Sequence, residues 1–352
     1  NREKIKAIST TTKSNSQTEL GQIKLFNYSK TFGGQERYIE SLIFEFNRRK
    51  LYFSFFGGPT RLTKINSICA DSNTNRLTVE LLNGNRALYL RSWWRTNADI
   101  RVYVQHSLVS DSQAPLLKKW IRKILLRIFL KRIDIVIRVC SQALPEAYAR
   151  GKIYTVHNGV SLPPLPAKSS ASRPFTLLMV GAVNDNKNQI MALRLLAKQD
   201  DLHLIVVGDG PRMLEWQQWA RDTGVDARVR WTGFADAPEE YYRQADSLLL
   251  LSQFEAFPYV VLEAMAYALP VIATCAGGIP DAITHEKDGL LLPRRDLKAL
   301  NDAVLRLKSD RAWCAHLGQQ ARKTVSERFT VEKMTDKLLA LIESTAEQKK
   351  AI

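Results

Sequence analysis

Two glutamates stand eight positions apart in the run SQFEAFPYVVLEAMA, which covers residues 252–266. A strand-like run ends at Ser252, and Pro258 suits the first turn of a helix. Glu255 is therefore expected on the loop between them, and Glu263 within the helix. The free amides at the helix start suit a diphosphate, and Glu263, roughly 7 Å further along at about 1.5 Å per residue, suits the two vicinal hydroxyls of a ribose. The alternative is that Glu263 faces solvent on an amphipathic helix.

Three other features carry residue types that could serve the same ligand. In the run VGAVNDNKNQ, Lys187 lies on a polar loop after a strand, where it is either a site residue or a solvated loop lysine. In TFGGQER, Gly33 and Gly34 stand between a strand and a helix, where glycines permit close approach of a ligand or positive φ, or form only a tight turn. His106 ends the strand-like run VYVQHS and is either a cleft residue or a core histidine.

Alternating apolar runs and helical segments position these residues. Strands are expected in the first half at residues 23–28, 51–58, 77–82, 87–90, 100–107 and 133–141, with a helix at 37–49. A regular strand–loop–helix rhythm follows a Pro-, Ser- and Ala-rich linker at 161–174. The pattern predicts an α/β protein of two doubly wound, Rossmann-like domains facing a cleft. The expected parts are a first domain at 1–166, a second at 167–330, and a last helix at 331–352 that crosses back to the first.

Composition bounds the class of protein. The chain of 352 residues is 45% hydrophobic, which suits two globular domains, and no apolar run is long enough for a membrane span. No signal peptide is visible, and the four scattered cysteines lack metal-site spacing, so they are expected to be reduced, as in a cytosolic protein. Residues 1–20 are polar and could be a tail or an extra edge element.

The charge is unevenly distributed. Residues 1–166 hold 27 Lys plus Arg against 11 Asp plus Glu, which gives +16, whereas residues 167–352 hold 24 of each, which gives zero. A basic first half and a neutral second half indicate that the two domains face different partners, and that the partner of the first is anionic.

The run PLLKKWIRKILLRIFLKRID, residues 115–134, concentrates this charge. Its basic residues are Lys118, Lys119, Arg122, Lys123, Arg127, Lys131 and Arg132. One helical stripe holds Leu117, Ile121, Ile124 and Ile128, flanked by Trp120 and Leu125. Leu126, Phe129 and Leu130 place further apolar surface on the basic side, which is typical of a helix at a membrane surface. The alternative is an ordinary docked helix with a solvated basic face. The run RSWWR at 91–95 suits the same interface, or is core.

The second half resembles retaining glycosyltransferase family 4, the group 1 glycosyltransferases of the GT-B fold. The resemblance rests on S-x-x-E-A-F-P-x-x-x-L-E-A-M-A, an E-x7-E signature, followed by ALPVIATCAGGIPDAI and DGLLLP. It implies that Glu255 contacts the donor sugar, Glu263 the ribose, and nearby amides the sugar and phosphates. The donor-binding set that it implies is Gly33, Gly34, Gly181, Lys187, Gly208, Gly210, Phe234, Glu255, Ala256, Phe257, Pro258, Tyr259 and Glu263.

Other parts of the resemblance are less complete. The loop with Lys187 resembles the family's phosphate-binding loop, but Ala182 stands where the family has an arginine, and Arg212 is a candidate substitute. The family often places a histidine near the donor sugar, where His106 falls. The run VHNGV resembles an element near the family's hinge, which implies structural roles for Asn158 and Gly159.

The resemblance implies an enzyme that moves a sugar, with retention, from a UDP- or GDP-linked donor. His106, Glu255 and Lys187 are the expected catalytic residues. The basic first half indicates an acceptor such as a lipid-linked saccharide, lipopolysaccharide or polysaccharide, and a peripheral place at the inner face of the cytoplasmic membrane. No Asp-x-Asp occurs, so no metal or other cofactor is expected.

Two alternatives stay open. One is a GT-B sugar-nucleotide epimerase or phosphorylase, against which the E-x7-E context speaks. The other is a basic nucleic-acid-binding protein, which the pI of about 9.7 would suit. No aromatic–basic stacking platform is evident, and the neutral half holds the best motifs, so no nucleic acid is expected as a partner.

Overall fold

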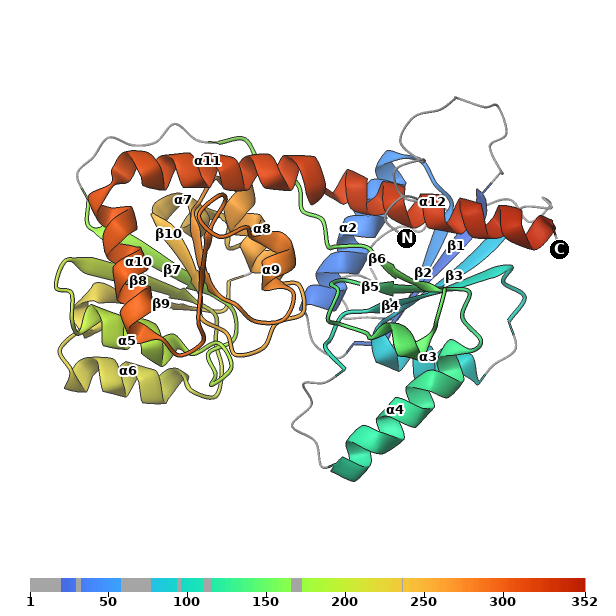
Figure 1. Ribbon diagram of the computed structural model, residues 1–352, viewed down its shortest axis with the longest axis horizontal. Helices are drawn as coiled ribbons and strands as arrows, with labels where there is room; N and C mark the ends of the chain where they lie inside the picture. The colour runs from blue at the N-terminus through green and yellow to red at the C-terminus, as the bar shows by residue number, and fades with distance from the viewer. Residues whose placement is uncertain are drawn as a thin grey trace.

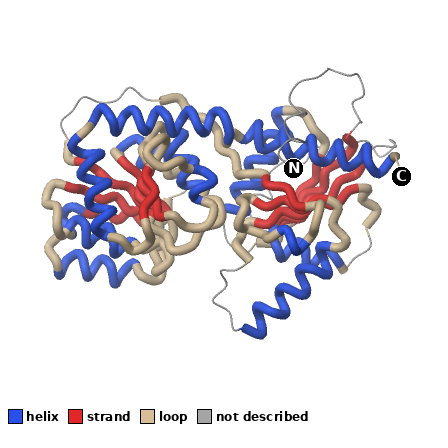
Figure 2. Tube along the Cα trace, viewed as in Figure 1, coloured by secondary structure: helices blue, strands red, loops and turns tan. Residues whose placement is uncertain are grey.

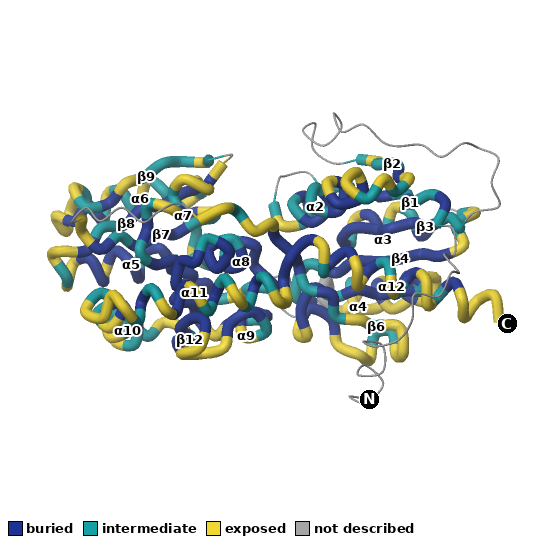
Figure 3. Tube along the Cα trace, turned by 90° about the horizontal axis from the view of Figure 1, so that it is seen from above, coloured by how far each residue is buried: buried dark blue, intermediate teal, exposed yellow. Residues whose placement is uncertain are grey.

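The computed structural model describes residues 20–29, 33–57, 77–93, 96–109, 116–165, 173–235 and 237–351, without the side chains of 116–119. Two six-stranded parallel sheets, each between layers of helices, lie side by side along the long axis of the molecule (Figure 1, Figure 2). Figure 3 shows the inner strands of each sheet buried, whereas edge strands and the helices carry exposed residues. The predicted α/β class with two doubly wound domains is confirmed. Residues 1–19 and 166–172, part of the expected tail and linker, lie outside the described residues.

The first sheet has the order β2-β1-β3-β4-β5-β6. Its strands are β1 (Leu20–Asn27), β2 (Phe53–Phe56), β3 (Leu77–Asn83), β4 (Ile100–Gln105), β5 (Ile135–Arg138) and β6 (Ile153–Thr155). Its helices are α2 (Gly34–Arg48), α3 (Gly84–Ser92) and α4 (Leu116–Leu130), with a 3-10 turn η2 (Glu146–Tyr148). Because β1 lies between β2 and β3, the chain reverses its direction of winding at β1, and the loops after β1 and β3 meet at this switch point.

The second sheet has the order β12-β11-β10-β7-β8-β9, in which β7 and β10 form the switch point. Its strands are β7 (Phe175–Val180), β8 (Leu202–Val207), β9 (Val229–Gly233), β10 (Ser247–Leu250), β11 (Val271–Thr274) and β12 (Leu290–Leu292). Its helices are α5 (Gln189–Leu196), α6 (Met213–Asp222), α7 (Glu239–Gln244), α8 (Tyr259–Ala266), α9 (Ile279–Ala282), α10 (Leu297–Ser309) and α11 (Arg311–Arg328), with a 3-10 turn η3 (Asp226–Arg228).

The chain passes between the two domains twice. After α11, helix α12 (Val331–Lys350) packs against α2 of the first domain, as Figure 1 shows. The earlier passage lies beside it: the amide of Val160 donates to the carbonyl of Phe329 at 2.9 Å. A Cβ on Gly159 would lie 2.4 Å from the carbonyl oxygen of Thr330, so only glycine allows the two passages to touch here.

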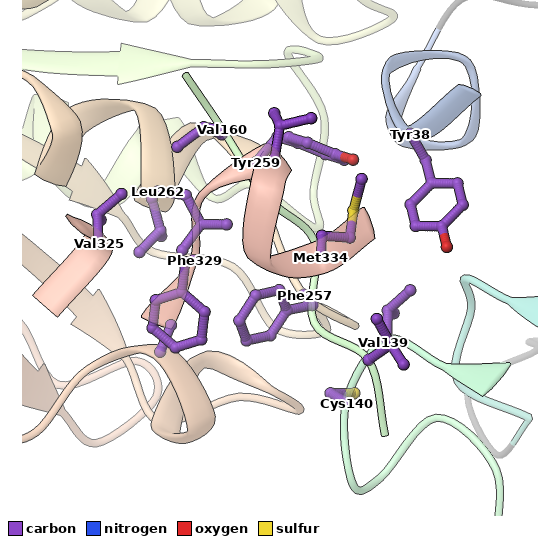
Figure 4. Close-up of a cluster of buried hydrophobic side chains, with 14 of the residues drawn as sticks. Tyr38, Val139, Cys140, Val160, Phe257, Tyr259, Leu262, Val325, Phe329 and Met334 are labelled. Atoms are coloured by element: carbon purple, nitrogen blue, oxygen red, sulfur yellow. The ribbon is translucent and has the colours of Figure 1, made fainter. Parts of the chain in front are cut away.

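Aromatic rings fill the space around these passages (Figure 4). The ring of Phe257 stacks on that of His157 with centroids 4.6 Å apart, and Phe329 lies 5.5 Å from both. Asn158 donates from Nδ2 to the carbonyl of Phe257 at 2.8 Å. This buried cluster joins residues of both domains, since Val139 and Cys140 of the first belong to it.

Two expectations for the first domain are wrong. Residues 87–90 form part of helix α3, not a strand. Gly84, with φ of +80°, turns the chain at the end of β3, and Ala87 and Leu88 then dock on the sheet at helical spacing. A run of four apolar residues cannot distinguish a short strand from a buried helical turn.

The faces of helix α4 are the reverse of the expected ones. Leu126, Phe129 and Leu130 do not add surface on an exposed side; they are buried against the first domain. The stripe of Ile121, Ile124 and Ile128 is exposed instead, together with Trp120 and Leu125. Both sets recur at helical spacing, so spacing alone could not decide which one docks.

Candidate active site

The predicted catalytic pair meets at the switch point of the second sheet. Lys187 follows β7 and Glu255 follows β10, and Lys187 Nζ lies 2.5 Å from Glu255 Oε1. Both side chains are largely buried, so the charges are paired where water is scarce. A Cβ on Gly181 would lie 3.3 Å from Cε of Lys187, so this glycine leaves room for the lysine side chain. The two motifs, 68 positions apart, thus form one ion pair.

Asparagines fix this pair, and sequence reasoning missed them. Asn184 Oδ1 accepts from the amide of Lys187 at 2.9 Å. Asn186 Nδ2 donates to the carbonyl of Phe254 at 3.1 Å, and its Oδ1 accepts from the amide of the same residue at 3.0 Å. The two loops are therefore cross-linked by an amide side chain that bonds the main chain in both directions. The asparagine-rich run NDNKNQ was the available indication.

The loop of Glu255 rests on two glycines after β11. A Cβ on Gly277 would lie 1.6 Å from the carbonyl oxygen of Glu255, and Gly277 has φ of +53°. A Cβ on Gly278 would lie 2.0 Å from the carbonyl oxygen of Ala256. No larger residue fits at either position without moving the loop.

Glu263 is not a solvent-facing residue, so that alternative is wrong. Only 18% of its side chain is exposed. Its Oε2 accepts from the hydroxyl of Tyr242 on α7 at 2.7 Å, and its Oε1 pairs with the guanidinium of Arg37 on α2. Glu263 therefore bridges α8 to the first domain, and Arg37 is a site residue that sequence reasoning missed.

The start of α2 faces the start of α8. A Cβ on Gly34 would lie 3.8 Å from Cδ2 of Tyr259, the first residue of α8. Neither Gly33 nor Gly34 has positive φ, so a positive φ is not the reason for glycine at these positions. A Cβ on Gly33 would lie 3.5 Å from Glu36 Oε2, so at both positions a side-chain carbon would make only ordinary van der Waals contacts, and the protein's own packing does not require glycine.

His106 lies just beyond β4, at the same edge of the first sheet. Its Nε2 is 2.6 Å from Asn83 Oδ1, and its ring meets Tyr38 edge-on at 4.9 Å. Asn83 donates from Nδ2 to the carbonyl of Gln35 at 3.0 Å, so Oδ1 is an acceptor and Nε2 of His106 carries the hydrogen. Burial lowers the pKa of His106 from 6.5 to about 3. The ring is neutral at pH 7, and Nδ1 is its acceptor.

The other predicted donor residues lie around this centre. Gly208 and Gly210 follow β8, where a Cβ on Gly208 would lie 2.0 Å from the carbonyl oxygen of Gly181. The side chains of Phe257, Pro258 and Tyr259 are buried, so these residues offer main-chain groups to a ligand, as does the half-buried Ala256. Phe234 after β9 is 67% exposed.

Arg212 does not point a free cation into the site. Its Nε donates to Asp185 at 2.9 Å, and it also pairs with Glu215, on the exposed start of α6. A cavity of about 410 Å³ opens beside α8 and is lined by Arg37, Tyr242, Tyr259 and Glu263, among others. It shares the Glu263 end of the predicted site and not the Lys187 end.

Comparisons with known proteins agree with this geometry. Residues 165–324 match the family model described as Glycosyl transferases group 1. N-acetyl-alpha-D-glucosaminyl L-malate synthase of Bacillus anthracis is 34% identical over 41% of this chain and 38% of its own length. Lipopolysaccharide core biosynthesis glycosyltransferase LpsD of Rhizobium meliloti is 28% identical over 48% of this chain and 49% of its own length. The chain thus spans less than half the length of these relatives.

The whole fold has solved counterparts. Alr3699/HepE of Anabaena, crystallised in complex with UDP, superposes with a TM-score of 0.78 over 92% of this chain and 100% of its own, at 19% identity. Two parallel doubly wound domains in this arrangement make the molecule a GT-B protein. The matched residues 165–324 hold the two glutamates and Lys187, so the likeness to the group 1 glycosyltransferases covers these three residues.

Proposed function

We propose that the protein is a retaining glycosyltransferase that moves a sugar from a nucleoside diphosphate sugar to a saccharide acceptor. The observation that carries this proposal is the start of α8, where Glu255 and Glu263 of a group 1 sequence motif are each held by a cation from another loop or domain. Donor amides, two carboxylates and a lysine converge there, which is the set that a sugar diphosphate needs.

Each group has a role that its position supports. The diphosphate lies at the amino end of α8, where free amides and the helix dipole favour negative charge. Lys187 leaves Glu255 for the phosphate nearest the sugar, and stabilises the charge that develops as the anomeric C–O bond breaks. Glu255 then accepts hydrogen bonds from the sugar hydroxyls.

The acceptor oxygen attacks the face from which the phosphate departs, and its proton passes to the leaving phosphate oxygen. His106 is neutral and held by Asn83, so its Nδ1 accepts a hydrogen bond from a sugar hydroxyl and transfers no proton. The chain has no Asp-x-Asp, so we assign charge stabilisation to amides and cations without a metal ion.

Nucleotide binding tests this function. Thermal unfolding should be followed with UDP, GDP, ADP and dTDP in the presence of a chelator. A ligand at about 100 times its Kd stabilises the native state by about 2.7 kcal/mol. One nucleotide should raise the melting temperature of the wild type, and Glu263→Ala should abolish the rise. Glu240→Ala, which removes an exposed carboxylate from nearby α7, should preserve it. No rise with any nucleotide would overturn the proposal.

We also propose that the acceptor is lipid-linked or anionic and that α4 holds the enzyme at an anionic membrane surface. None of the helices in the described ranges is long and apolar enough to cross a bilayer. Helix α4 projects from the first domain and docks by one face only (Figure 1). Its opposite face exposes Trp120 by 62% and Ile128 by 51%, and Trp93 lies exposed against Phe129.

A row of cations runs beside this apolar face. Lys123 and Arg127, four residues apart, are exposed on one side of α4, and the exposed Lys131 lies in the turn that follows the helix. Of the other predicted basic residues, Arg132 donates to the carbonyl of Ser92 at 2.6 Å and Arg122 is half-buried. The side chains of Lys118 and Lys119 lie outside the described residues. Apolar side chains at the centre and cations at the flank suit an interface of acyl chains and anionic headgroups.

Vesicle co-sedimentation tests the membrane proposal. The wild type should bind phosphatidylglycerol vesicles more tightly than phosphatidylcholine vesicles. The double variant Lys123→Ala, Arg127→Ala should bind about 30-fold more weakly, at about 1 kcal/mol for each of the two charges. The double variant Ile124→Ser, Ile128→Ser should also bind at least about tenfold more weakly, because it removes apolar side chains that would enter the acyl region. Leu214→Ser, at an exposed position of α6, is the matched control. Equal binding by all variants, or tighter binding to duplex DNA than to vesicles, would contradict the proposal.

A further inference from the structure

Two ion pairs flank the start of α8: one joins two residues that were expected at the site, and the other joins Glu263 to Arg37, which was not expected there. Lys187 holds Glu255, and Arg37 holds Glu263. The first pair lies within the second domain, whereas the second joins α8 to α2 of the first domain. Arg37 is therefore a cation that reaches the donor site from across the cleft, and it is the only basic side chain among the described residues that line the 410 Å³ cavity.

The loop that carries Lys187 has no second cation. Ala182 follows Gly181 at a position where the related motif carries an arginine, so Lys187 is left to face a diphosphate alone. The nearby arginines are committed elsewhere. Arg212 pairs with Asp185 and Glu215, while Arg294 and Arg295 donate to Gln253 on the exposed side of the loop.

We propose that Arg37 is the second cation of the donor site, held by Glu263 while the site is empty and released to the diphosphate when ribose hydroxyls take over Glu263. This assignment rests on the proposed function of the site. The exchange leaves no charge unpaired: the carboxylate gains two hydroxyl donors, and the guanidinium gains phosphate oxygens, for which its fork geometry is suited.

The distances allow this exchange. Glu263 lies four residues beyond Tyr259, about 6 Å along α8 at about 1.5 Å per residue. The flexible side chain of Arg37 can cover that distance without any movement of α2, because Gly34, one turn earlier, already stands against Tyr259. The Tyr242 hydroxyl, which also donates to Glu263, keeps the carboxylate in place when Arg37 leaves.

The test is the preference for a diphosphate over a monophosphate. UDP and UMP, with GDP and GMP as the second pair, should be titrated calorimetrically into the wild type and into Arg37→Ala. The ratio of the UMP Kd to the UDP Kd should fall about 10- to 100-fold in the variant, as expected for loss of a charge-assisted hydrogen bond. UMP binding itself should hold or tighten, because Glu263 is freed for the ribose. Arg37→Lys should retain part of the preference.

A second substitution sharpens the assignment. Ala182→Arg, added to Arg37→Ala, should restore the diphosphate preference, because it places a second cation on the loop that carries Lys187. Arg212→Ala and Arg294→Ala are matched controls and should leave the ratio unchanged. If Arg37→Ala does not fold, as judged by its circular dichroism melt, Arg37→Gln replaces it.

The outcomes separate the two proposals. Equal weakening of UDP and UMP in the Arg37 variants, or no weakening, would overturn the role of Arg37 while leaving the donor site in place. A loss of the ratio in Arg212→Ala instead would assign the second cation to Arg212. A wild type that binds neither UDP nor GDP would overturn both the role of Arg37 and the function on which it rests.

Discussion

The two domains share an architecture and differ in how their sequences mark the site. Both are six-stranded parallel sheets, and in both the site lies near the carboxyl ends of the strands, beside the switch point. In the second domain these residues lie in recognisable local motifs on a neutral background. In the first, Arg37, Asn83 and His106 come from separate elements with no common motif, and much of the surplus charge lies on α4 at the edge of the molecule. Under the proposed function, the donor site would be encoded by local motifs, and the acceptor side by the character of the surface.

The largest effect is expected where the domains meet. Phe257→Ala should lower the free energy of unfolding by about 3–5 kcal/mol, because the ring is 4% exposed and packs on His157 and Phe329. Phe44→Ala, at a 60% exposed position of α2, should change it by less than about 0.5 kcal/mol. Urea denaturation measures both. Equal losses would show that the cluster in Figure 4 does not couple the domains.

A smaller effect, on turnover, is expected from the ion pair of the second domain. Lys187→Ala should lower kcat about 10²- to 10³-fold, or about 3–4 kcal/mol, because it removes the cation that meets the departing phosphate. The loss should be the same with soluble and with vesicle-borne acceptors. Lys198→Ala, an exposed lysine after α5, should retain full turnover. If the Lys187→Ala variant lost turnover only with vesicle-borne acceptors, Lys187 would have a role in membrane binding and not in the chemical step.

The sequence predicted the second domain well because its determinants are local. The rhythm of strand, loop and helix, the proline before α8 and the spacing of Glu255 and Glu263 are each visible within about fifteen residues. Lys187 could be paired with Glu255 only through the assumption that loops after adjacent parallel strands meet. The structure places them 2.5 Å apart, and their roles stay predictions.

The first domain was harder to predict, for physical reasons. Arg37 and Glu263 are 226 positions apart, and no local pattern marks an ion pair that forms only when two domains face each other. Helix α4 has two apolar stripes, and which one docks depends on the shape of the surface below it. The ion pair and the docked face of α4 both depend on tertiary packing, as does the helical conformation of residues 87–90.

The smallest expected effect is on the pH dependence of the free energy of unfolding. It tests whether His106 of the first domain can be protonated in the folded protein, as an acid catalyst would have to be. The pKa of His106 is lowered from 6.5 to about 3 by burial, so between those values the unfolded chain binds a proton that the folded protein does not. Stability contributed by this group is therefore present above about pH 6.5 and declines as the pH falls toward 3. Since the ring is half-buried, the slope should stay below the limit of about 1.4 kcal/mol per pH unit for one proton.

His106→Gln should flatten the fall in unfolding free energy between pH 6.5 and 4, measured by urea denaturation at each pH. The amide retains a donor for Asn83 Oδ1 and has no proton to gain. His157, whose pKa burial also lowers, keeps a residual slope in the variant. Parallel profiles for wild type and variant would show that His106 is accessible to protons when folded. It could then serve as an acid, and the first domain would contribute chemistry to the site as well as position.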